Sequence, residues 1–303
     1  MAENIRNIAA SVHSRLLSKA RESGRPFNEL LQHFAIERFI CRLSKSHYAD
    51  KFILKGALMF AAWCGHGSRP TMDIDLLGRI DNDLEAVITA VRDACDAEVE
   101  ADGISFDAAS VQATRIAEDA LYEGVRVRLK GHLGNARVVL QIDIGFGDVI
   151  VPGPASVSYP TLLGFPAPEL QGYTIESTVA EKFQAMVKLG MLNSRMKDFY
   201  DVWLLSHMFD FKGDRLATAI QTTFENRRTP IPVAPAVFDS AFVEDQEKKT
   251  QWRAFIRKSM LSDAPASFEK IVAAIRTFLG PLVSSLAKTN EFHGAWKAPG
   301  PWR

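Results

Sequence analysis

Apolar residues recur with the 3.6-residue period of an amphipathic helix in several parts of the chain. Near the N-terminus, Ile36, Phe39, Ile40 and Leu43 stand at i, i+3, i+4 and i+7, which places them on one helical face. The helices predicted in this way are residues 3–22, the segment after Pro26, and residues 57–63, 83–95, 174–190, 195–207, 251–260 and 267–282. Helical sequence therefore dominates both ends of the chain.

The middle of the chain follows a period of two residues instead. Between residues 137 and 144, apolar side chains alternate with Val139, Gln141 and Asp143, as in a strand with one buried face. Gly131 and Gly134 mark the turn of a hairpin that joins this strand to the preceding one. The predicted strands are residues 72–76, 105–106, 111–116, 125–130 and 137–144.

A segment rich in proline and glycine separates the strand-rich part from the helical part, which indicates a domain boundary. We therefore predict an α+β protein with a mixed β-sheet core, flanking helices and a helical C-terminal domain. The predicted parts are N-terminal helices packed on the core (1–50), the α/β core (51–150), a connector (151–172), the helical domain (173–287) and a flexible tail (288–303).

Composition and charge narrow the function classes. The 303 residues include 36 basic and 36 acidic ones, a balance that argues against a generally basic nucleic-acid-binding protein but leaves room for a local patch. The cysteines Cys41, Cys64 and Cys95 lie in apolar sequence and are expected to be reduced core residues of a cytoplasmic protein. We find no signal peptide and no bilayer-spanning apolar stretch, so no membrane partner is expected.

The first candidate site is the pair Asp73 and Asp75. In a strand these side chains share one face, and two converging carboxylates suit Mg²⁺, which leaves coordination positions for phosphates. Upstream, Lys55 and Gly56 precede the predicted helix 57–63, and a helix N-terminus beside a glycine can bind phosphate. The combination predicts a metal–triphosphate site. A purely structural role of the Asp-x-Asp pair is the alternative.

Further acids offer two ways to complete such a site. Asp143 lies inside an apolar strand, where a carboxylate must be paired or bound to a metal, and a salt bridge at a sheet edge is the alternative. Asp198 and Asp201 share a face of a helix, although acids in a first helical turn also suit the helix dipole.

Zinc-hydrolase, P-loop and dinucleotide-binding motifs are missing from the sequence. Metal-dependent phosphoryl or nucleotidyl transfer fits this set of residues.

Several ordered motifs together resemble one known family. They are Ala-Ile-Glu-Arg-Phe at 35–39, Arg-Leu-Ser at 42–44, Leu-Lys-Gly at 54–56, Arg-Pro-Thr-Met-Asp-Ile-Asp-Leu at 69–76, Gln-Ile-Asp-Ile-Gly-Phe-Gly-Asp at 141–148, Ala-Glu-Lys at 180–182, Arg-Met-Lys-Asp-Phe-Tyr-Asp at 195–201, Arg-Arg-Thr-Pro-Ile-Pro at 227–232 and Gln-Trp at 251–252. Over residues 14–282 the chain resembles the AbiEii/AbiGii toxin family, within the DNA polymerase β-like nucleotidyltransferase superfamily. One departure is Ala57, where the superfamily usually has a serine after the glycine.

The resemblance implies a nucleotidyltransferase-like core and assigns roles to individual residues. Asp73 and Asp75 would bind Mg²⁺ with Asp143 as a third metal ligand, and Lys182 and Asp198 would complete the catalytic set, with Asp201 as the rival acid. The residues expected to bind the NTP are Lys55, Gly56, Arg69, Thr71 and Asp201. The resemblance further implies a toxin of a toxin–antitoxin or phage-defence system that transfers a nucleotide from an NTP to RNA, with tRNA as the expected acceptor and an antitoxin protein as a further partner.

Two other functions fit the same residues. A kinase-like phosphotransferase acting on a protein would use the same acids, and a non-catalytic nucleotide- or partner-binding module would only retain the fold. On the second helix Arg38, Arg42 and Lys45 are interpreted as a solvated face, with a nucleic-acid patch as the alternative. The local RNA-binding surface that the leading function requires is expected at Arg195, Lys197, Arg227 and Arg228.

Overall fold

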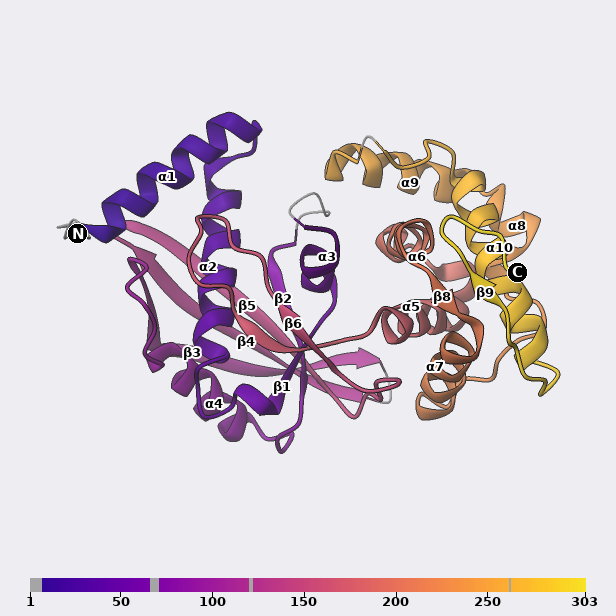
Figure 1. The fold of residues 1–303 in the computed structure, drawn as a ribbon, viewed down its shortest axis with the longest axis horizontal. Helices are drawn as coiled ribbons and strands as arrows, with labels where there is room; N and C mark the ends of the chain where they lie inside the picture. The colour runs from indigo at the N-terminus through magenta and orange to yellow at the C-terminus, as the bar shows by residue number, and fades with distance from the viewer. Residues whose placement is uncertain (1–6, 66–70, 120–121, 262) are drawn as a thin grey trace. The chain divides into compact units, whose positions relative to one another are not determined.

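The computed structural model describes residues 7–65, 71–119, 122–261 and 263–303, which form two compact units (Figure 1). The first unit contains residues 1–147 and 155–172, and the second contains residues 148–154 and 173–303. The chain passes between the two units three times, after Gly147, Pro154 and Gly172.

The first unit is built on a mixed seven-stranded sheet with strand order β3-β4-β5-β2-β1-β7-β6. The β2–β5 and β1–β7 pairs are parallel and the other neighbours are antiparallel. The strands are β1 (Phe52–Lys55), β2 (Asp73–Gly78), β3 (Ile104–Asp119), β4 (Tyr122–Leu133), β5 (Ala136–Phe146), β6 (Ala155–Ser158) and β7 (Glu169–Gly172). The helices of this unit are α1 (Ile8–Ser23), α2 (Phe27–Leu43), α3 (Ala57–Cys64) and α4 (Leu84–Asp96). The prediction of an α+β fold with a mixed-sheet core is confirmed.

Alternation along β5 shows how the sheet separates its two faces. Val138, Leu140, Ile142 and Ile144 are buried, and α2 and α4 pack on strands of the sheet. The intervening residues, including Gln141, stay partly or fully exposed on the other face. The period of two therefore gives the sheet one apolar face under helices and one polar face.

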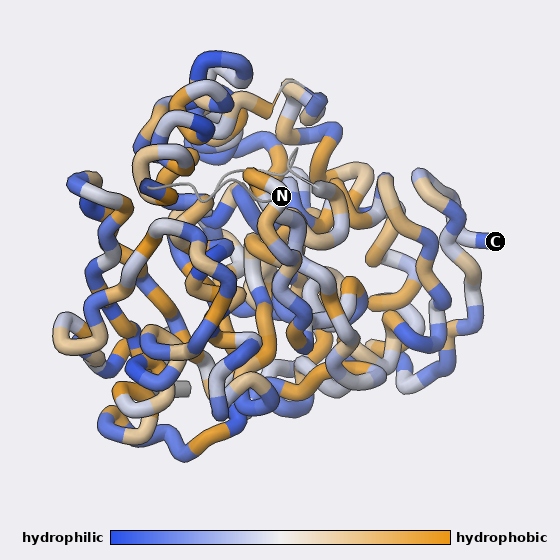
Figure 2. The backbone as a smooth tube through the Cα atoms, turned by 60° about the vertical axis from the view of Figure 1, so that its left-hand side comes forward, coloured by the Kyte–Doolittle hydropathy of each residue, from blue (hydrophilic) through white to orange (hydrophobic). Residues whose placement is uncertain are grey.

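The second unit is mainly helical. Its helices are α5 (Ile175–Leu189), α6 (Met196–Met208), α7 (Gly213–Asn226), α8 (Ser240–Val243), α9 (Gln246–Ser259) and α10 (Phe268–Leu286), with a two-stranded ribbon of β8 (Phe211–Lys212) and β9 (Ala295–Trp296). Figure 2 shows hydrophobic and hydrophilic stretches alternating along the backbone. Among the helices that the structure describes, none combines the length and the apolar character that crossing a membrane requires.

Two segments differ from the expectations drawn from the sequence. The expected connector 151–172 contributes β6 and β7 to the sheet edge, because the backbone of β7 pairs with β1. The expected flexible tail includes β9, and its Trp296 is buried with the indole Nε1 donating to the Ser206 carbonyl at 2.7 Å. A tail with buried aromatic side chains gains enough apolar contact to become ordered.

Two of the three basic residues expected on a solvated face of α2, Arg38 and Arg42, are instead buried in ion pairs, whereas Lys45 follows the end of α2 and is exposed. Arg42 donates from both terminal nitrogens to Asp102, at 2.7 and 3.0 Å. Arg38 lies beside Glu37, with Nε 3.1 Å from Oε1, and donates to the Pro166 carbonyl. The interpretation of Arg38 and Arg42 as a solvated face, and the nucleic-acid alternative, are therefore wrong for these two residues, since both side chains are needed to neutralise buried acids.

Glu37 makes the stability of the first unit depend on pH. Burial raises the pKa of Glu37 from 4.5 to about 7, against the opposing effect of the hydrogen bond that it accepts from the Leu162 N–H. The folded state therefore holds a proton that the unfolded state releases from about pH 4.5 upward, so stability falls as the pH rises from about 4.5 to about 7. We expect a loss of about 3 kcal/mol across this interval.

Urea unfolding of wild type and Glu37→Gln at pH 5 and pH 8 checks this expectation. Wild type should lose about 3 kcal/mol of unfolding free energy between the two pH values, whereas the variant carries no titrating group at this position. The unfolding free energy of the variant minus that of wild type should therefore increase by about 3 kcal/mol from pH 5 to pH 8. A difference that is equal at both pH values would contradict the assignment.

Candidate functional site

The polar face of the sheet brings several predicted site residues into one line across the strands. Lys55 on β1 is the register partner of Asp75 on β2, and Asp75 is the register partner of Asp143 on β5. Two residues earlier on β2, Asp73 stands opposite Gln141. Register partners point to the same face of a sheet, so Asp73 and Asp75 share this face as their spacing predicts.

Gly56 packs directly against the carboxylate of Asp75. Its backbone has φ +68° and ψ −147°, a conformation that is costly for residues with a side chain. A Cβ atom at this position would lie 2.0 Å from Asp75 Oδ2. The first residue of α3, Ala57, follows at once, so the N-terminus of this helix begins beside the acid. Only glycine permits this close approach.

Thr71 and Arg69 are the other residues expected to bind the triphosphate in the first unit. The Thr71 hydroxyl donates to the Asp73 carbonyl at 3.4 Å, so its position is tied to the backbone of the Asp-x-Asp pair. Arg69 lies outside the described residues. The NTP role of both residues stays a prediction.

Asp143 is already neutralised by an arginine that the sequence analysis did not single out. Arg126 on β4 donates from Nε to Oδ1 at 2.8 Å and from Nη2 to Oδ2 at 2.7 Å. This bidentate ion pair engages both carboxylate oxygens of Asp143, which favours the salt-bridge alternative for this residue over metal binding. The available signal was the alternation Arg126-Val-Arg128-Leu-Lys130, which places basic residues on one face of a strand next to the acids.

The fit of Mg²⁺ to this face therefore depends chiefly on Asp73 and Asp75. Both supply hard carboxylate oxygens, and both are partly exposed. Across the part of the chain that the structure describes, no group of three or more His, Cys, Asp or Glu side chains could hold a metal by itself. Two protein carboxylates with phosphate oxygens as further ligands are a usual arrangement for Mg²⁺, so these residues fit the ion.

Three other predicted residues form a cluster within the second unit. Lys182 on α5 lies with Nζ 2.9 Å from Asp198 Oδ1 and 2.7 Å from Asp201 Oδ2, both on α6. Arg195, at the start of α6, places Nε 2.7 Å from the other oxygen of Asp198. Asp198 and Asp201 are fully buried. Burial without these cations would be very unfavourable, so the cluster holds α5 and α6 together.

Arg227 belongs to a second buried ionic network and is unsuited to bind RNA. Its Nη2 lies 2.9 Å from Asp148 Oδ1 and 3.2 Å from Glu181 Oε2, and its Nη1 donates to the amide oxygen of Gln184. Burial alone would lower the pKa of Arg227, but the carboxylates of Glu181 and Asp148 outweigh it and raise the pKa. The prediction of Arg227 as an RNA contact is wrong, because both neighbouring acids occupy its guanidinium group.

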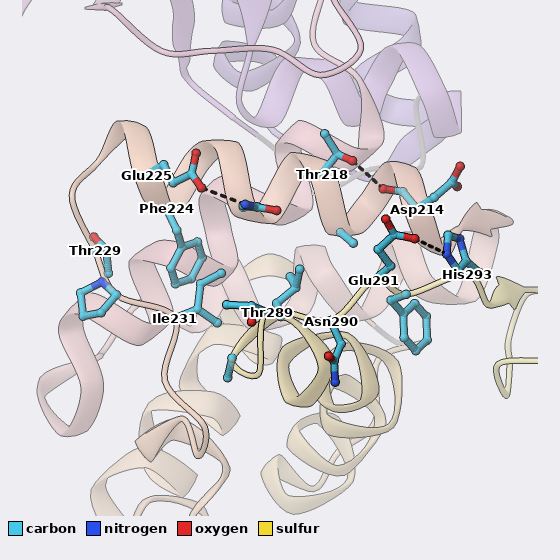
Figure 3. Close-up of a pocket in the computed structure, with 16 residues that line it drawn as sticks. Asp214, Thr218, Phe224, Glu225, Thr229, Ile231, Thr289, Asn290, Glu291 and His293 are labelled. Carbon is cyan, nitrogen blue, oxygen red and sulfur yellow. Dashed lines mark hydrogen bonds and ion pairs between the residues drawn. The ribbon is translucent and has the colours of Figure 1, made fainter.

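A cavity of about 660 Å³ lies in the second unit, between α7, residues 229–231 and residues 286–293 (Figure 3). Its charged lining consists of Asp214, Glu225 and Glu291, and Figure 3 shows the last of these hydrogen-bonded to His293. Neither lysine nor arginine lines it, and none of the predicted site residues reaches it. An acidic cavity repels the phosphates of an NTP, so we do not place the triphosphate there.

One family model and two solved structures are similar to this chain. A family model described as nucleotidyl transferase AbiEii toxin, type IV toxin–antitoxin system, matches residues 38–274. Among curated proteins none is significantly similar to the chain. The structure is similar to JHP933 from Helicobacter pylori, with 13% identity, 86% of this chain and 94% of that chain covered, and a TM-score of 0.46. A provisionally assigned nucleotidyltransferase from H. pylori is similar with 14% identity, coverage of 87% and 98%, and a TM-score of 0.44.

Proposed function

The chain belongs to the AbiEii family of nucleotidyltransferase toxins, and from this premise we propose that it transfers a nucleoside monophosphate from an NTP to RNA, with tRNA as the expected acceptor. In this reaction an acceptor hydroxyl oxygen forms a bond to the α-phosphorus, the bond to pyrophosphate breaks, and the hydroxyl proton passes to a base. The observation that carries the proposal is the polar face on which Asp73, Asp75 and Lys55 meet beside Gly56.

Each residue of this face has a role that its position supports. Asp73 and Asp75 would hold Mg²⁺, which when bound neutralises triphosphate charge and favours attack at phosphorus. Lys55 stands in register with Asp75 and adds a positive charge for the phosphates. The amide groups at the N-terminus of α3, which follow Gly56, are suited to phosphate oxygens. Thr71 and Arg69 would complete the NTP contacts.

Lys182 and Asp198 enter the proposal through the family resemblance. Within the second unit, Asp198 and Asp201 fix the Lys182 ammonium group from two sides. Such a lysine can neutralise charge on a transferring phosphoryl group, while its carboxylate partners hold it in place. We assign Asp198 and Asp201 this positioning role first, because both are fully buried. Asp143 would act by holding Arg126.

The family description adds a cellular context. A type IV toxin–antitoxin assignment supports a toxin whose effect a partner protein counteracts, and we extend this to a role in phage defence within the cytoplasm, where NTPs and tRNA are present. Induced expression in a bacterial host should arrest growth, and Asp73→Asn should relieve that arrest at equal protein level.

The direct test is incubation of the protein with total RNA, Mg²⁺ and each α-³²P NTP in turn, beside Asp73→Asn. The asparagine is isosteric and the side chain is partly exposed, so folding should be preserved while a metal-binding charge is lost. Label on a tRNA-sized band with wild type alone supports the proposal and identifies the nucleotide. Label retained only from γ-³²P NTP would indicate phosphotransfer, and an equally active Asp73→Asn variant would exclude this acid from catalysis.

A further inference from the structure

A row of basic side chains lies on the same sheet face as the acids. We define the basic row as Arg128, Lys130 and His132 of β4 together with Arg137 of β5. Residues two apart on β4 point to one face, and Arg137 is the register partner of His132, so all four share that face. Adjacent members on β4 are separated by about 7 Å.

The charges of the basic row are available to a ligand. Arg128, Lys130 and Arg137 are exposed. Arg128 donates to the neutral amide oxygen of Gln141, and neither it nor Lys130 forms an ion pair with any residue that the structure describes. The acid opposite Lys130 on β3, Asp107, accepts the Ala109 N–H at 3.0 Å. Arg126 differs, because it is paired with Asp143.

Strand order fixes how the basic row lies relative to the acids. Arg128 stands opposite Gln141 on β5, and Gln141 stands opposite Asp73 on β2. Arg128 is thus two strands from Asp73 on the same face, a separation of about 10 Å at the usual strand spacing. From Arg128 the basic row continues along β4 through Lys130 and His132, with increasing distance from Asp73.

We propose that the basic row binds the phosphate backbone of the acceptor RNA and leads its 3′-terminal single strand toward Asp73 and Asp75. This inference rests on the proposed function and specifies its acceptor surface. Positive side chains spaced along one strand match a polyanion better than a compact anion such as an NTP. Transfer to an RNA end requires that a terminal hydroxyl approach the acids. Arg128 lies about two β-strand spacings from Asp73, so the end of an RNA strand bound along the row can reach them.

The inference replaces a surface that the sequence had suggested elsewhere. Arg227, one of the residues expected to bind RNA, is committed to Asp148 and Glu181. The chain as a whole is neutral, with 36 basic and 36 acidic residues, so attraction of RNA requires a local patch. The exposed charges of β4 and β5 provide that patch within the first unit.

The test measures RNA binding in the absence of NTP. Fluorescence anisotropy with a labelled single-stranded RNA oligonucleotide is recorded over a series of salt concentrations for wild type and for the double variant Arg128→Gln, Lys130→Gln. The matched control is Lys19→Gln, Arg79→Gln, which removes the same two charges from exposed positions of the first unit outside the row. The slope of log K against log salt is negative, and each lost phosphate contact reduces its magnitude by about 0.7 for single strands. The slope of the double variant should therefore be smaller in magnitude than that of wild type by about 1.4.

Weaker binding with this loss of slope in the row variant, and wild-type values in the control, is the expected result. An unchanged slope in the row variant, an equal loss in the control, equal binding of fully duplex RNA or no RNA binding by wild type would each overturn the proposal. The labelling assay separates the two inferences. If the row variant shows the reduced slope but wild type has no transfer activity, the RNA-binding surface is supported and the proposed function is rejected. If wild type transfers nucleotides but the row variant keeps the wild-type slope, the proposed function is supported and the surface is rejected.

Discussion

Gly56→Ala is expected to reduce nucleotide transfer at least about 100-fold, because displacement of a catalytic group by about 1 Å is enough for such a loss. The new methyl group would lie 2.0 Å from Asp75 Oδ2, and the contact can be relieved only by moving the carboxylate or the start of α3. The backbone conformation at φ +68° adds strain on the order of 1–3 kcal/mol for any residue with a Cβ.

Gly65→Ala provides a matched control for this prediction. Gly65 follows α3 with φ +73° and ψ −165°, close to the conformation of Gly56, but a Cβ there meets no described atom within 4 Å. Both variants therefore suffer similar backbone strain, and only Gly56→Ala disturbs Asp75. Thermal unfolding and the labelling assay on both variants separate strain from misplacement. Equal activity of the two alanine variants would show that the close approach to Asp75 is not required.

Lys182→Met is expected to destabilise the second unit by about 3–5 kcal/mol, the usual consequence of removing one partner from a buried ionic group. Asp198 and Asp201 are fully buried, and each has an oxygen within 3 Å of Lys182 Nζ. Methionine preserves most of the side-chain volume, so the loss reports charge rather than a cavity. Urea unfolding measures the change, with Lys258→Met, an exposed position on α9, as the control expected to stay within about 0.5 kcal/mol.

A double variant checks the cause of that loss. Adding Asp201→Asn to Lys182→Met removes one of the two buried charges, while Arg195 still accompanies Asp198. The double variant should therefore be more stable than Lys182→Met alone, which is the coupling expected of residues in one network. If the double variant is instead less stable than Lys182→Met by the loss that Asp201→Asn causes alone, the lysine stabilises this part of the fold by packing and not by charge.

Local pattern was sufficient for most elements of the fold. The expected helix at 3–22 corresponds to α1 over the residues that the structure describes, with residues 3–6 outside them. The expected hairpin joins β4 and β5 with its turn at Gly134, but Gly131, also expected in the turn, lies within β4 opposite Val138. Short elements escaped prediction. The strands β6 and β7 have four residues each and lie in sequence rich in proline and glycine, where no periodicity can develop. β7 is stabilised by pairing with the distant β1, which no local pattern reveals.

The sequence by itself determined the classes of residue and their local directions: the shared face of Asp73 and Asp75, the glycine before α3, and the family to which the chain belongs. These follow from periodicity and motif order, which are properties of neighbouring residues. Only the tertiary structure decided the partners of the charged side chains. Arg126 neutralises Asp143, Arg227 is enclosed by acids, and Arg128 is left exposed on the polar face. The physical reason is that burial and strand register, set by contacts between distant segments, decide which charges are neutralised and which remain available.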